Sequence, residues 1–157
     1  MQDYSIEDER RFSDLRQRTK EFGLRIIRMW KQLPNTPVAE ILGKQLLRSA
    51  TSVAANYRAA CIAKSEADFY HKIKICQEEA DESCLWIEYI IEAGILPESK
   101  LRNLLDEAQQ LTAIMTASAI TAKNWSIICS EKSDKSTRIS SSSRSKKIVL
   151  MRFVSKH

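Results

Sequence analysis

The sequence has few of the residues that break regular structure or carry common active-site chemistry. Its 157 residues include three Gly, three Pro, two His and four Cys. So few Gly and Pro argue against a turn-rich β-sandwich, and no apolar run approaches the ~20 residues of a membrane span. The first eight residues, MQDYSIED, lack the apolar core of a secretion signal. The sequence therefore predicts a soluble, cytoplasmic protein without a membrane segment.

The cysteines and histidines do not form a recognisable metal or redox motif. The four Cys show no two-residue spacing, so neither a zinc site nor a redox site is expected. A di-iron site in a helical bundle needs two Glu-x-x-His motifs, and the nearest approximation is Asp68 with His71. We therefore expect no metal, no cofactor and no catalytic residue, and we expect the cysteines to act as small buried side chains.

What the sequence has instead is four stretches with apolar residues three and four positions apart. This spacing is typical of amphipathic helices. Pro34 and Pro37 separate the first two stretches, Ser65 begins a capping pattern, and Gly94 ends the third stretch. Short loops between long helices predict an all-α fold, an antiparallel up-down four-helix bundle. The expected helices cover residues 6–33, 37–64, 66–93 and 97–125.

The composition changes after residue 125. Residues 126–157 contain ten Ser, eight basic and two acidic residues, a composition that does not support a packed core. We therefore predict one domain, residues 1–125, followed by a disordered, Ser-rich, basic, low-complexity tail, residues 126–157. The body itself is polarised, because residues 16–64 sum to +8 and residues 65–100 sum to −6.

Three stretches in the middle of the chain resemble a known family. They read LGKQLLRSATSVAANYRAA at residues 42–60, EEADESCLWIE at residues 78–88 and EAQQLTAI at residues 107–114. In this order and spacing they resemble the four helix bundle protein family, also called the 23S ribosomal RNA intervening-sequence protein family. The resemblance covers about residues 18–125 and leaves the tail outside.

The resemblance implies a fold and a set of partners. It implies an antiparallel four-helix bundle that forms a homopentamer in bacteria, without enzymatic activity. The family is also similar to the accessory protein of diversity-generating retroelements, which engages nucleic acid and a reverse transcriptase. The implied partners are therefore a second copy of the chain, RNA or DNA, and a reverse transcriptase.

Basic residues on the first two helices form the first candidate site. At 100° per residue, those of the first helix fall opposite its apolar stripe, where Lys and Arg can neutralise phosphates. The alternative interpretation is a solvated helix surface, which is what most runs of charge are. The candidate nucleic-acid-binding residues are Arg16, Arg18, Lys20, Arg25, Arg28, Lys31, Lys44, Arg48 and Arg58.

A second candidate feature is polar pairing between the second and third helices. Small side chains line the second half of the second helix and the middle of the third, so these helices are expected to be close neighbours. Asn56 lies on the small-residue stripe, and a buried amide needs a partner. We expect it to bond an acid of the third helix and fix the register, with a ligand pocket as the less favoured alternative. The residues of this pairing are Asn56, Arg58, Glu79 and Glu82.

The outer side of the third helix is the candidate subunit interface. Leu85 and Tyr89 lie opposite the core stripe, with Ile75 and Trp86 beside them. A helix with a second apolar face usually has a second partner. The opposite charges of the first and third helices also suit a head-to-tail ring.

Together these features predict a non-catalytic, self-associating bundle that binds nucleic acid. The alternative is a protein–protein interaction module, such as an accessory subunit of a reverse transcriptase, without direct nucleic-acid binding. Nucleic-acid binding predicts a steep dependence on salt, whereas an apolar protein interface around Leu85 and Trp86 predicts little dependence on salt.

Overall fold

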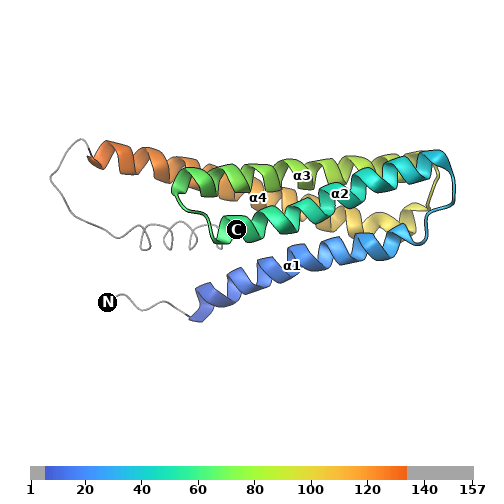
Figure 1. The fold of residues 1–157 in the computed structure, drawn as a ribbon, viewed down its shortest axis with the longest axis horizontal. Helices are drawn as coiled ribbons and strands as arrows, with labels where there is room; N and C mark the ends of the chain where they lie inside the picture. Colours follow the sequence, from blue (N-terminus) through green and yellow to red (C-terminus); the bar gives the residue numbers. More distant parts are fainter. Residues whose placement is uncertain (1–5, 134–157) are drawn as a thin grey trace.

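The fold is an antiparallel arrangement of four long helices (Figure 1). The computed structural model describes the backbone of residues 6–133 and the side chains of residues 14–124. The helices are α1 (Ile6–Trp30), α2 (Pro37–Cys61), α3 (Glu66–Glu92) and α4 (Glu98–Ser133). The predicted all-α four-helix bundle is therefore confirmed. No helix within the described range is long and apolar enough to cross a membrane.

Side-chain caps begin α2 and α3 where the sequence predicts them. Thr36 Oγ1 accepts a hydrogen bond from the Ala39 N–H at 3.3 Å. Ser65 Oγ accepts one from the Asp68 N–H at 3.1 Å, and the Asp68 carboxylate accepts one from the Lys64 N–H at 2.9 Å. These bonds satisfy amides that have no partner within a first helical turn, so they fix where each helix starts.

Gly94 ends α3 in the way that its position predicts. It has a φ of +65°, a conformation that only glycine adopts without strain. Its N–H donates to the Ile91 carbonyl at 2.9 Å, and the Ile95 N–H donates to the Ile90 carbonyl at 3.0 Å. This pair of bonds is the Schellman motif, which satisfies the last carbonyls of a helix.

The fourth helix is longer than predicted. It runs to Ser133, eight residues beyond the expected end at residue 125. The added residues contain neither Gly nor Pro, so nothing local stops the helix. The rest of the predicted tail, residues 134–157, lies outside the described residues.

The predicted apolar stripes form the core. Every residue of the expected α3 stripe is buried, and Thr19, Phe22 and Ile26 of α1 are at most 1% exposed. The packing is most extensive between α2 and α3 and between α3 and α4. By contrast, α1 packs mainly on α2, touches α4 at few points and diverges from the other helices toward its N-terminal end (Figure 1). The buried α3 stripe consists of Phe69, Ile73, Cys76, Ala80, Ser83, Ile87 and Ile90.

Candidate nucleic-acid interface

Two of the predicted nucleic-acid-binding arginines bridge α1 to α4. Arg18 donates from Nε to Glu107 Oε1 at 2.6 Å, and from Nη2 to Glu107 Oε2 at 3.0 Å and Gln110 Oε1 at 2.7 Å. The Arg18 and Glu107 side chains are 34% and 17% exposed. Arg25 Nη2 donates to the Asn103 carbonyl at 2.9 Å. These two arginines therefore face α4, and the prediction that they belong to a solvent-facing basic surface is corrected.

Two further candidates are neutralised on their own helices. Arg28 pairs with Glu21 at 2.6 Å, and Lys44 pairs with Glu40 at 2.5 Å. The Lys44 ammonium also holds the pKa of the Glu40 carboxyl below its usual value. Both pairs are largely exposed, so their charges are screened by solvent and add little to stability.

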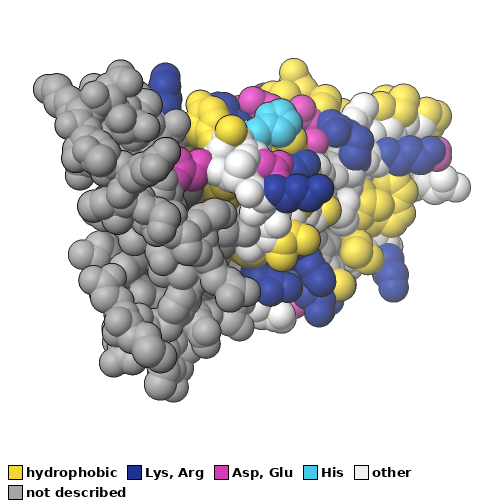
Figure 2. Space-filling view, turned by 60° about the vertical axis from the view of Figure 1, so that its left-hand side comes forward, with side chains coloured by type: hydrophobic (Ala, Val, Ile, Leu, Met, Phe, Trp, Pro, Cys, Tyr) yellow, Lys and Arg dark blue, Asp and Glu magenta, His cyan; other side chains and the backbone are white. Residues whose placement is uncertain are grey.

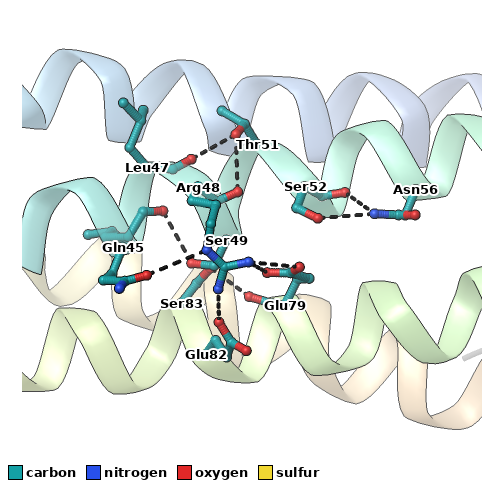
Figure 3. Close-up of polar contacts among 11 residues, drawn as sticks. Gln45, Leu47, Arg48, Ser49, Thr51, Ser52, Asn56, Glu79, Glu82 and Ser83 are labelled. Atoms are coloured by element: carbon teal, nitrogen blue, oxygen red, sulfur yellow. Dashed lines mark hydrogen bonds and ion pairs between the residues drawn. The ribbon is translucent and has the colours of Figure 1, made fainter.

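Arg48 is the polar centre of the seam between α2 and α3 (Figure 3). Its Nη2 donates to Glu82 Oε2 at 2.5 Å, and its Nη1 lies 3.3 Å from Glu79 Oε1. Below this surface cluster, the buried Ser49 and Ser83 hydroxyls are 2.9 Å apart. The predicted closeness of α2 and α3 is confirmed, and Arg48 holds the two acids that were expected to pair with Asn56.

The predicted role of Asn56 is wrong. Its Nδ2 donates to the Ser52 carbonyl and to Ser52 Oγ, both at 3.0 Å, so its bonds stay within α2 (Figure 3). Arg58 is exposed, and no carboxylate pairs with it among the described side chains. A half-buried amide one turn from a serine satisfies itself locally, which a helical wheel does not show.

Four of the nine candidates are exposed and have no carboxylate partner among the described residues. Gly23 is the point at which α1 packs closely on α2. A Cβ added to it would lie 3.7 Å from the Ala50 carbonyl oxygen of α2. Lys20 and Arg16 are three and seven positions from Gly23 on α1, whereas Lys31 follows the end of α1 and Arg58 lies on α2. We call these four exposed residues the basic seam: Arg16, Lys20, Lys31 and Arg58.

Basic side chains are spread over the face drawn in Figure 2. On the face shown in Figure 2, basic side chains stand in separate groups with hydrophobic side chains between them. They do not merge into one continuous patch there. The nine candidates therefore divide between structural contacts and the shorter basic seam.

The outer side of α3 carries the exposed apolar residues that the sequence predicts. Leu85 is 40% exposed and Tyr89 is 47% exposed, while Ile75 and Trp86 are half-buried. The rings of Trp86 and Tyr89 are 5.9 Å apart, measured between centroids. The Trp86 Nε1–H is buried and finds no acceptor within the described part of the chain. Their role as a subunit interface stays a prediction.

Two cysteines of α3, Cys76 and Cys84, are small buried residues that contact α2 and α4. Cys76 Sγ donates to the Val53 carbonyl at 3.6 Å, and burial raises the pKa of its thiol to about 12. Burial also raises the pKa of Cys84, which lies beside Thr112. Among the side chains that the structure describes, no three His, Cys, Asp or Glu gather as a metal site requires.

The sequence pattern of the 23S rRNA-intervening sequence proteins matches residues 12–117, which is most of the chain. The chain belongs to this family. Among solved structures, it is similar to a protein of unknown function from the S23 ribosomal protein family of Bacteroides thetaiotaomicron. That protein is 30% identical, with a TM-score of 0.62 over 66% of this chain and 96% of the other. No curated protein matches the chain.

The residues that sequence reasoning missed are the acceptors on α4. Asn103, Glu107 and Gln110 are spaced four and three apart, beside the core residues Leu104 and Leu111. This spacing places them on one edge of α4, which was a usable signal for a polar contact with a neighbouring helix. The sequence alone did not say which helix lies at that edge, so the arginine partners were not foreseen.

Proposed function

We propose that this member of the family is a non-catalytic protein that binds or scaffolds nucleic acid, RNA or DNA, through the basic seam. One observation carries the proposal: Arg16, Lys20, Lys31 and Arg58 are exposed, and none of them pairs with a carboxylate among the described residues. Uncompensated Lys and Arg side chains bind phosphates and release counterions.

The length of the basic seam suits a short stretch of duplex. Arg16 and Lys31 are fifteen positions apart, or about 22 Å at ~1.5 Å per residue. This distance corresponds to roughly six base pairs of duplex DNA. Four contacts to phosphate predict that log Kobs falls with log salt with a slope of about −4. Such binding follows charge rather than base sequence, because phosphate contacts carry no sequence information.

The test uses the full chain and a variant in which the four residues of the basic seam become Ala. Binding to a duplex DNA and to an RNA hairpin is followed by fluorescence anisotropy across a salt series. We expect the variant to bind more weakly at low salt and to lose a slope of about 4. Lys100→Ala with Lys123→Ala, at exposed positions of α4, is the control and should leave the slope nearly unchanged.

Binding through the basic residues of the C-terminal part of the chain is the alternative that would overturn this proposal. Residues 134–157 contain seven basic residues and one acidic residue. If the variant binds as wild type does, with the same slope, the affinity comes from outside the basic seam. If neither protein binds, the nucleic-acid function itself fails.

A second candidate function is a protein–protein interaction module, such as an accessory subunit of a reverse transcriptase. The exposed Leu85 and Tyr89 favour it, together with the buried Trp86 N–H that has no acceptor in the described structure. Association through these side chains should change little with salt. Binding of a protein partner that survives at about 0.5 M salt, and is lost in Leu85→Ala with Tyr89→Ala, would favour this second function.

A further inference from the structure

The second half of α4 has an uncharged surface. Residues 108–122 contain no Asp, Glu, Lys or Arg, and the next longest uncharged run within a described helix is nine residues, in α2. One side of this stretch faces the core, where Leu111 and Met115 are 0% exposed. The other side faces solvent, and Ile120 on it is 57% exposed. Four residues spaced four, three and four apart share that side, which we call the outer α4 face: Gln109, Ala113, Thr116 and Ile120.

The solvent side of a surface helix normally carries charge. Helix α2 follows this rule, because Lys44, Arg48 and Arg58 are exposed on it. The centre of the outer α4 face has small side chains instead, and the Thr116 hydroxyl already donates to the Thr112 carbonyl at 2.8 Å. Covering Thr116 therefore leaves no hydroxyl proton without an acceptor. These features suit a surface that another helix covers.

One unpaired charge stands at each end of the outer α4 face. Asp106 precedes the face and Lys123 follows it, and both side chains are exposed. Neither forms an ion pair among the described side chains, and Arg102, one turn before Asp106, pairs instead with Glu98 at 2.7 Å. The two charges are seventeen positions apart, about 26 Å at ~1.5 Å per residue. The face therefore has a negative charge at one end and a positive charge at the other.

Such a face is complementary to a second copy of itself. In an antiparallel pair, Ala113 of one copy can lie beside Thr116 of the other. Asp106 lies seven positions before Ala113, and Lys123 lies seven positions after Thr116, so the opposite charges meet at both ends of the contact. A parallel pair would place Asp106 beside Asp106 and Lys123 beside Lys123. Charge therefore favours the antiparallel orientation, in which each contact occurs twice.

We propose that the outer α4 face pairs with the same face of a second copy in an antiparallel, two-fold contact. Ion pairs between Asp106 and Lys123 set the orientation and register, while burial of Ile120 and Ala113 supplies affinity. The small side chains at the centre let the two helices approach closely. A two-fold contact is closed, so it doubles the mass of whatever it joins. It uses no residue of the basic seam.

Charge exchange in the full chain tests this pairing. Asp106→Lys places a lysine opposite Lys123 of the second copy, and Lys123→Asp places an aspartate opposite Asp106. Sedimentation velocity of a dilution series at low salt should show that each variant pairs at least about tenfold more weakly than wild type. Each variant should therefore fall to about half the wild-type mass at concentrations where wild type stays paired. An equimolar mixture of the two variants should recover the wild-type mass, because the lysines of one variant meet the aspartates of the other.

Matched controls carry the same charge changes away from the outer α4 face. Asp14→Lys on α1 and Lys64→Asp before the start of α3 are at exposed positions, and both should keep the wild-type mass. The proposal is overturned if wild type has no greater mass than Asp106→Lys, if either variant pairs as strongly as its control, or if the mixture does not recover the wild-type mass. Circular dichroism of each variant confirms that it is folded.

Ala113→Cys tests the register independently. In the proposed contact, the two introduced thiols lie near the two-fold axis. Copper phenanthroline should oxidise them to a disulfide, with two protons released and one electron taken up by each of two Cu²⁺ ions. A covalent dimer on a non-reducing gel should then exceed the background from the native cysteines of wild type. Ala55→Cys, at an exposed position of α2, should give no more than this background, and equal yields from the two variants would refute the register.

Discussion

The α2–α3 seam and the α1–α4 seam join helices of one bundle by opposite means. Between α2 and α3, small side chains are fully buried, with the Ser49 and Ser83 hydroxyls 2.9 Å apart. Between α1 and α4 there are few contacts, and Arg18 closes the gap by a bidentate pair with Glu107. The first seam excludes water, whereas the second remains partly open to it.

This difference shows why basic residues alone do not define a nucleic-acid site. Where backbones approach closely, two helices are held together by close packing of small side chains, and an added methylene group has no space. Where they stay apart, long side chains span the distance, and arginine is suited to it because its guanidinium binds a carboxylate with two hydrogen bonds. Arg18 and Arg25 thus serve the bundle, although their position on α1 suggested an open surface.

The largest expected effect comes from enlarging a side chain in the α2–α3 seam. Ser49→Leu inserts a branched side chain where the residue is 0% exposed and leaves Ser83 without its partner hydroxyl. Overpacking and the lost hydrogen bond together should lower the free energy of unfolding by about 3 kcal/mol. Urea unfolding followed by circular dichroism measures this loss.

Ala55→Leu is the control for this prediction, because Ala55 is exposed on the same helix. It should change the free energy of unfolding by less than about 0.5 kcal/mol. A Ser49→Leu variant as stable as this control would show that the α2–α3 seam tolerates volume. The contrast with the α1–α4 seam would then be unfounded.

The second prediction concerns pH and the same seam. The pKa of Cys76 is raised to about 12 by burial, against about 8.5 in an unfolded chain. Below pH 8.5 the Cys76 thiol keeps its proton in the folded and in the unfolded state, so its ionisation does not lower the free energy of unfolding. As the pH rises above this value only the folded state keeps it, and stability falls, by about 2 kcal/mol near pH 10.

Cys76→Ala isolates this effect. The variant leaves a small cavity, which lowers stability equally at every pH. We expect the variant to lose about 2 kcal/mol less than wild type between pH 8 and pH 10 in urea unfolding. Equal losses in the two proteins would mean that Cys76 ionises in the folded state as readily as in the unfolded state. Burial also raises the pKa of Tyr57. This shift lowers the free energy of unfolding of wild type and of the variant alike as the pH rises.

Much of the fold could be predicted because it follows from local signals. Stripes spaced three and four apart, the caps at Thr36 and Ser65, and the stop at Gly94 each depend on neighbours in sequence. The end of α4 was missed, because the Ser-rich composition was averaged over 32 residues. The first eight of them contain no Gly or Pro, and the helix continues through them.

The site was predicted less well because it depends on which helix faces which. Arg18 lies at the border of the apolar stripe of α1, three positions after Leu15 and four before Phe22, and α4 lies at that edge. In the same way, the wheel of α2 places Asn56 toward α3, yet its amide bonds Ser52 within its own helix. Charge identifies candidate residues, but the partners that neutralise a charge come from distant positions and appear only in three dimensions.

The smallest expected effect concerns the α1–α4 seam, through a double-mutant cycle of Arg18→Ala and Glu107→Ala. The pair is partly exposed, so we expect a coupling energy of only about 1 kcal/mol, reduced at about 1 M salt. The cycle of Arg28→Ala and Glu21→Ala, an exposed pair within α1, should give less than about 0.5 kcal/mol. Chemical denaturation by urea at low and high salt measures both. Equal coupling in the two cycles would mean that Arg18 is an ordinary surface base, which would return it to the candidates for nucleic-acid binding.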